Sequence, residues 1–195
     1  HKVMLSDFYI GETEVTQALY SAVIGARSEW TDEKGLGDNF PAYSISPSDW
    51  MNFLAQLNYL IGKPSGVTFR NPSEAEWEYA AREGNKSVGY LYSGGSSIAE
   101  LGWYQSNSNS TTHPVAGKAP NALGLYDMSG NLWEFCAGES SYSSDNQTQP
   151  WGTKWMSRGG AWDSEYYKCS VYRRQGYHST NTGYNTIGFR LVIGL

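Results

Sequence analysis

Residues 69–84 of the chain read FRNPSEAEWEYAAREG, and they separate two parts of different character. Ser73 and Glu76 have the spacing of a capping box, in which two side chains satisfy free backbone N–H groups at the start of a helix. Trp77 follows on the apolar face, and Gly84 is the type of residue that most often follows a helix. The stretch therefore predicts a short helix that begins after Ser73 and ends near Gly84.

Two more helices are predicted before this stretch. Val15, Leu19 and Val23 recur at four-residue spacing within residues 15–25, which is typical of one buried stripe. The segment from Ser46 to Gly62 begins with a capping residue, a proline at the first helical position and an acidic residue in the first turn. Its apolar residues then recur with helical spacing. The first 84 residues are thus expected to contain three helices.

The chain after residue 84 has a different composition. It holds most of the Gly, Ser, Asn and Tyr residues, and its apolar stretches are short, which favours short strands between ordered loops. The 8 Trp, 15 Tyr and 6 Phe residues must supply much of the core. A length of 195 residues is typical of one domain. We therefore expect a single α+β domain with few helices, short antiparallel strands and a large loop-rich half.

The charge of the chain excludes one class of partner. Lys and Arg total 14 against 19 Asp and Glu, which gives a formal net charge of −5 at pH 7. Binding to a phosphate backbone needs a basic stripe, which the sequence lacks. No apolar run approaches the roughly 18 residues that would span a bilayer. We therefore expect neither a nucleic-acid partner nor a membrane-spanning segment.

Motifs that go beyond secondary structure lie in order along the chain: Phe8–Gly11 with Glu14–Thr16, residues 69–82, NALGLYDMSGNLWE at 121–134, RGGAW at 158–162 and GFRL at 188–191. Together they resemble the formylglycine-generating enzyme (sulfatase-modifying factor) domain family over residues 1–195. The resemblance implies a C-type-lectin-like fold. This family includes oxidases that convert a cysteine to formylglycine, as well as non-enzymatic binding members.

The resemblance bears on catalysis through two thiols. Members that oxidise a substrate cysteine bind copper through two cysteines that lie five residues apart, shortly after the GG-(S/A)-(W/Y) motif. In this sequence those positions hold Ser164 and Cys169. Because Cu(I) prefers soft thiolate ligands and a serine cannot replace one, we expect no copper and no formylglycine-type activity.

A second cysteine leaves an alternative open. Cys136 could supply the missing thiol beside Cys169, which would give a copper-dependent oxidase that forms formylglycine from a peptide cysteine. The interpretation that we favour is a structural disulfide, or a buried pair, between these two residues. Most cysteines are inert core residues unless they are exposed and lie near positive charge.

The segment from Asp127 to Glu134 has the composition of a calcium loop. Two carboxylates flank a glycine, and hard oxygen ligands of this kind suit Ca²⁺. The resemblance to the family implies a structural calcium held by the side chains of Asp127 and Glu134 and by the main-chain oxygens of Gly130 and Leu132. The alternative is that Glu134 pairs with Arg158 or Arg190 in the core.

The segment from Ala161 to Ile187 is rich in Tyr, Ser, Thr and Asn, which is the composition of antibody-like binding surfaces. It also resembles the variable segment of diversity-generating retroelement proteins, some of which use this domain. The alternative is that these are ordinary solvated loop residues with no ligand. The predicted ligand-binding residues are Asp163, Ser164, Glu165, Tyr166, Tyr167, Tyr172, Arg174, Tyr177, His178, Asn181, Tyr184 and Asn185.

These observations favour a non-catalytic module that recognises a protein or glycan ligand. Its expected location is extracellular, on a cell surface or on a virion surface. The oxidase described above is the alternative function. A third possibility is a structural component of a surface assembly with no small ligand.

Overall fold

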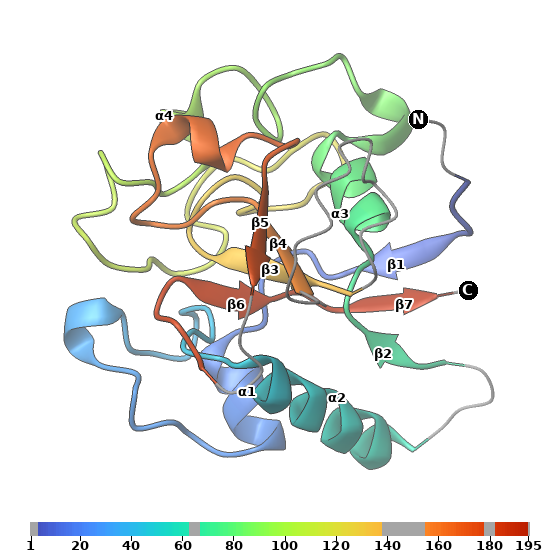
Figure 1. The fold of residues 1–195 in the computed structure, drawn as a ribbon, viewed down its shortest axis with the longest axis vertical. Helices are drawn as coiled ribbons and strands as arrows, with labels where there is room; N and C mark the ends of the chain where they lie inside the picture. The colour runs from blue at the N-terminus through green and yellow to red at the C-terminus, as the bar shows by residue number, and fades with distance from the viewer. Residues whose placement is uncertain (1–3, 63–66, 138–154, 178–181, 195) are drawn as a thin grey trace.

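The computed structural model describes residues 4–62, 67–137, 155–177 and 182–194. Within these ranges two small sheets lie at the centre of the molecule (Figure 1). Helices α1 (Gln17–Val23) and α2 (Pro47–Ile61) lie below the sheets in this view, and long loops fill the upper part. The fold is therefore the α+β arrangement with a loop-rich half that the sequence predicts.

The smaller sheet joins the two ends of the chain. Strand β7 (Val192–Gly194) lies between β1 (Phe8–Ile10) and β2 (Phe69–Arg70), and both pairings are antiparallel. Tyr9 lies opposite Ile193 in this register. The pairing of β1 with β7 brings the first and last described residues to the same side of the molecule (Figure 1).

The larger sheet carries the residues of most interest. Its order is β5 (Arg174–Tyr177), β4 (Trp155–Arg158), β3 (Trp133–Cys136) and β6 (Ile187–Phe189). Strand β3 pairs in parallel with β6, and the other two pairings are antiparallel. The sheet is therefore mixed, which the expectation of antiparallel strands did not include.

The three predicted helices are present, and the predicted caps start two of them. Ser46 caps α2 and Ser73 caps α3 (Glu74–Ala81), each in a complete capping box. Thr16 caps α1 through its side chain. The described residues also include the short helix α4 (Ile98–Leu101) and three 3₁₀ helices, η1 (Asp32–Lys34), η2 (Gly84–Lys86) and η3 (Tyr166–Cys169). No helix in the described part of the chain is long and apolar enough to cross a membrane.

Two details of the helix predictions are wrong. In α1 the buried side chains are Gln17 and Tyr20, whereas Leu19 of the predicted stripe is exposed. The Gln17 amide is buried because it donates to the carbonyl oxygens of Gly35 and Pro41. Gly84 does not directly follow α3 but begins η2.

Aromatic side chains form the centre of the core, as the composition predicts. Tyr20 of α1 stacks on Phe53 of α2 at 5.3 Å between ring centroids, and Phe53 meets Phe189 of β6 edge-on at 5.2 Å. Trp50 packs edge-on against Trp155 at 5.1 Å. These contacts fasten the two helices to the larger sheet. The loops above the sheet then rest on a rigid base.

Candidate functional site

The two cysteines are free thiols in separate parts of the core. Cys136 ends β3 and belongs to the hydrophobic cluster of Trp77 and Val171. Cys169 ends η3 and belongs to the cluster of Tyr92 and α4. The prediction that they form a structural disulfide or a buried pair is therefore wrong.

Burial keeps both thiols protonated near neutral pH. Loss of solvation raises the pKa of Cys169 to about 12 and raises the pKa of Cys136 well above its ordinary value. Copper(I) binds thiolates rather than thiols, and reactive cysteines lie in exposed, electropositive surroundings. Both residues therefore have the buried surroundings that are typical of core cysteines.

Ser164 and Cys169 have local roles that need no metal. The Ser164 hydroxyl oxygen accepts a hydrogen bond from the Ala161 N–H at 3.0 Å, which closes a turn. Gly160 has a left-handed φ of +78°, and a Cβ atom there would lie 2.5 Å from the Cys169 sulfur. Cys169 thus fills the space beside the Gly159–Gly160 pair, and Ser164 shapes the segment that follows.

Glu134 is fully buried, and both of its carboxylate oxygens accept hydrogen bonds. Its carboxylate accepts hydrogen bonds from the Trp77 indole at 2.7 Å and from the Arg190 guanidinium at 2.6 to 3.1 Å. Arg158 instead pairs with Glu74 and Glu78. Of the two core arginines that the alternative interpretation named, Arg190 is therefore the partner of Glu134.

Asp127 and Glu14 add two more carboxylates near this pair. The Asp127 Oδ2 atom accepts a hydrogen bond from the Ala116 N–H at 2.7 Å, but its buried Oδ1 atom has no hydrogen-bond partner. Burial raises the pKa of Asp127 to about 6. Burial, followed by repulsion from Asp127 and Glu134, raises the pKa of Glu14 well above its ordinary value. Three buried carboxylates thus share the field of Arg190.

This arrangement suits a cation only in part. Carboxylates have about four lone-pair sites, and in Glu134 the bonds to Trp77 and Arg190 occupy them. The free Oδ1 atom of Asp127 favours a bound cation. The described residues hold no group of three or more His, Cys, Asp or Glu side chains with metal-binding geometry. Any ion here would depend on main-chain oxygens.

Some of the predicted ligand-binding residues are exposed at the surface, and others are part of the framework that supports it. Ser164 is buried, and Arg174 forms a two-point ion pair with Glu74 at 2.6 and 2.7 Å, so neither belongs to an open face. The side chain of Tyr177, together with His178 and Asn181, lies outside the described residues. Seven predicted residues are exposed: Asp163, Glu165, Tyr166, Tyr167, Tyr172, Tyr184 and Asn185.

An ion-pair network anchors this segment to α3. Glu74 accepts from both Arg174 of β5 and Arg158 of β4, and Arg158 also donates to Glu78 and to the Val171 carbonyl. Arg158 is completely buried. The positions that hold the segment in place are therefore distinct from the positions that face solvent.

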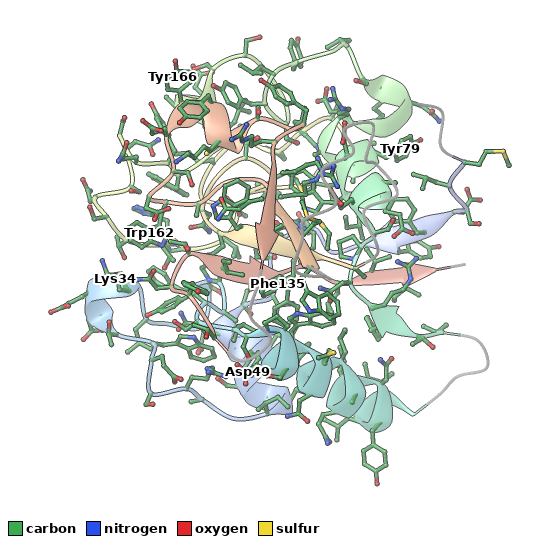
Figure 2. The ribbon with its side chains drawn as sticks, viewed as in Figure 1. Lys34, Asp49, Tyr79, Phe135, Trp162 and Tyr166 are labelled. Atoms are coloured by element: carbon green, nitrogen blue, oxygen red, sulfur yellow. The ribbon has the colours of Figure 1, made fainter. Side chains whose placement is uncertain are left out.

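The exposed residues around η3 lie together with a part of the chain that the sequence analysis missed. The Val171 N–H donates to the Leu91 carbonyl at 3.0 Å, which places residues 90–91 beside Tyr172. Tyr166 and Tyr167 meet edge-on at 5.7 Å. Tyr166 projects from the upper end of the molecule in Figure 2. We name the exposed side chains at this place the tyrosine surface: Tyr90, Leu91, Tyr166, Tyr167 and Tyr172.

Tyr184 and Asn185 lie elsewhere. The Tyr184 carbonyl accepts from the Ser44 N–H, and the Asn185 carbonyl accepts from the Trp162 indole at 3.0 Å. In Figure 1 the segment that enters β6 runs near α1 and α2, away from η3. Asn185 is thereby close to Trp162, which precedes the predicted residue Asp163, and lies apart from the tyrosine surface. No signal in the sequence showed that residues 90–91 would join η3.

The two small sheets, α3 and the ordered loops together define the fold class of this chain. The family model for the sulfatase-modifying factor enzyme 1-like domain matches residues 1–195, and the chain belongs to this family. It has the fold of the formylglycine-generating enzymes.

Proteins that are similar to this chain are described as having different roles. Chaperone protein LppX of Paenibacillus barcinonensis is 32% identical over 204 residues, which cover 83% of this chain and 71% of that protein. The formylglycine-generating enzyme of Streptomyces coelicolor is 24% identical over 250 residues, with 97% and 79% covered. Among solved structures, Treponema denticola variable protein 1 superposes with a TM-score of 0.85 and 27% identity over all of this chain and 87% of that chain.

Proposed function

We propose that the protein is a non-catalytic module that binds a partner protein through the tyrosine surface. The observation that carries this proposal is the contrast between exposed tyrosines and the buried framework beneath them. Tyr166 and Tyr172 are 58% and 54% exposed, while Cys169, Ser170 and Val171 between them are buried. Tyrosines presented on a rigid base lose little conformational entropy on binding and supply a large contact area.

A protein partner is favoured over a glycan by the shape of the surface. Small-ligand sites are concave. Two hollows of the described residues lie at Gly11–Thr16 and at the end of α2, and neither is lined by these tyrosines. The relative from Paenibacillus, described as a chaperone, also supports a role on another protein.

The similarity to Treponema denticola variable protein 1 supports a further part of the proposal, that residues 161–187 are diversified by a retroelement. The exposed positions of this segment can change without disturbing the buried framework. A near-identical template repeat and a reverse transcriptase beside the gene are expected. Their absence would refute this part. For such a recognition module we propose an extracellular, cell-surface or virion-surface location, which protease accessibility on intact cells or particles would test.

We also propose one structural Ca²⁺ at the Asp127–Glu134 loop. The Asp127 carboxylate and the main-chain oxygens of Gly130 and Leu132 would hold it, because these are hard oxygen ligands and Asp127 Oδ1 has no other partner. Glu134 is not a ligand in this proposal, because its oxygens already accept hydrogen bonds from Trp77 and Arg190. When bound, the ion would order the loop and offset its negative charge.

Capture of partners from the native host, followed by affinity measurement with variants, tests the binding proposal. The triple variant Y166A/Y167A/Y172A removes the centre of the surface. Since truncation of one hot-spot side chain costs about 2 kcal/mol or more, and Tyr is enriched among hot spots, one such residue among the three should lower affinity roughly 30-fold or more. The matched control Y9A/Y59A removes two exposed tyrosines that lie elsewhere, on β1 and α2, and should bind normally. Equal binding by the triple variant, or binding lost on removal of partner glycans, would refute the proposal.

A further inference from the structure

Glu14 belongs to the N-terminal segment, and its side chain contacts the Asp127–Glu134 loop. Its side chain is buried. Its neighbour Val15 is fixed on both sides, because the Val15 N–H donates to the Phe189 carbonyl at 2.9 Å and the Val15 carbonyl accepts from the Ala42 N–H at 2.8 Å. The Glu14 carboxylate is therefore held in place by the backbone that carries it.

Both oxygens of Glu14 contact the loop. Oε1 accepts from the Leu132 N–H at 3.0 Å, and Oε2 accepts from the Asn131 side-chain amide at 2.9 Å. Asn131 has a left-handed φ of +62°, and its side chain also bonds to both backbone polar groups of His113. Glu14 thus contacts the loop at a residue with left-handed backbone.

Every backbone N–H group from Gly130 to Trp133 donates to a different segment of the chain. The acceptors, in order, are the Gly159 carbonyl, the Trp103 carbonyl, the Glu14 carboxylate and the Thr186 carbonyl. Since an N–H and the carbonyl of the preceding residue share one peptide plane, these bonds fix the directions of the carbonyls from Ser129 to Leu132. Glu14 is the one side chain among these four acceptors, and so the one that substitution can remove.

We propose that Glu14 is a positioning residue for the calcium loop, which it holds in the shape that presents the Gly130 and Leu132 carbonyls before any ion is bound. The proposal rests on the structural calcium proposed above. Glu14 contacts the loop through Asn131 and Leu132 and not through the ion.

The test measures binding of Ca²⁺ alone by isothermal titration calorimetry and of Tb³⁺ by tryptophan-sensitised luminescence. Glu14→Gln replaces an acceptor oxygen with an amide N–H₂ group, which then faces the N–H donors of Asn131 and Leu132. Loss of a partner that orients metal ligands typically weakens binding about 10- to 100-fold, and we expect a loss in this range. Glu12→Gln is the matched control, because it makes the same side-chain change at an exposed residue two positions before Glu14.

Two further variants keep the proposal falsifiable if Glu14→Gln folds poorly. Asn131→Gly preserves the left-handed backbone and all the carboxylates but removes the contact with Glu14 Oε2, so it should also weaken binding. Glu14→Asp keeps the carboxyl group but shortens its reach, and it should bind Ca²⁺ more weakly than wild type. Wild-type affinity in Glu14→Gln or in Asn131→Gly would overturn the role of Glu14 while leaving the calcium proposal intact. Absence of binding to the wild-type protein would overturn both.

Discussion

Glu74→Gln is expected to destabilise the protein by about 3 kcal/mol, because one carboxylate serves two arginines. Arg158 is completely buried, and the Glu74 side chain is only 6% exposed. Removing one partner of a buried ion pair costs roughly 3–5 kcal/mol, since the remaining charge stays buried without compensation. Arg158 would keep Glu78 at 3.1 Å and the Val171 carbonyl at 3.4 Å, which places the loss near the lower end.

Denaturant unfolding and calorimetry measure this loss. For a chain of this size each kcal/mol lowers the Tm by roughly 2–4 °C, so a decrease of about 6–12 °C is expected. Glu29→Gln serves as the control, because Glu29 forms an ion pair at the surface whose removal should change stability by less than about 1 kcal/mol. Arg174→Gln combined with Glu74→Gln should cost less than the sum of the two single changes, because both remove the same contact.

A loss below about 1 kcal/mol for Glu74→Gln would show that the framework does not depend on this ion-pair network. The same variants distinguish residues that stabilise the fold from residues that contact the partner. Arg174→Gln should lower stability, yet at temperatures where it remains folded it should bind partners as the wild type does.

Other expected outcomes follow from the geometry. Gly160→Ala forces a left-handed alanine against Cys169 and should cost about 3 kcal/mol by denaturant unfolding; a loss below about 1 kcal/mol would contradict the steric account. The thiols of Cys136 and Cys169 should react with a disulfide reagent at pH 8 only after unfolding, because burial raises both pKa values; rapid reaction of the folded protein would show an accessible thiolate. The pKa of Glu76 is lowered, since bonds from Arg70 and the helix cap outweigh the opposing effect of burial. Its stabilising contribution is complete above the ordinary value of 4.5 and declines as the pH falls below it, so Glu76→Gln should cost about 1 kcal/mol at pH 7 and flatten the acid limb of the stability profile. An unchanged acid limb would argue against this role.

Local chemistry explains which parts of the fold were predictable. The capping boxes at Ser46 and Ser73 act within three residues, so the sequence is enough to place α2 and α3. The strands are two to four residues long, which is too short for an alternating pattern to identify them. The parallel pairing of β3 with β6 depends on contacts between residues more than fifty positions apart.

The candidate site was predictable to a similar extent. The tyrosines of η3 were found because composition alone marks a binding surface. Tyr90 and Leu91 were missed because a single backbone hydrogen bond brings them to η3. Arg174 was assigned to the ligand face because nothing local reveals that Glu74, a hundred residues earlier, holds it.

We propose that this chain binds a partner and does not oxidise a peptide cysteine. Mass spectrometry of a cysteine-containing sulfatase peptide, incubated with the reduced protein, Cu(I) and oxygen, distinguishes these two functions, with the Streptomyces coelicolor enzyme as the positive control. We predict unaltered peptide at times when the control has converted its cysteine to formylglycine. Formylglycine that forms with the wild-type protein and disappears in Cys169→Ala would contradict the claim.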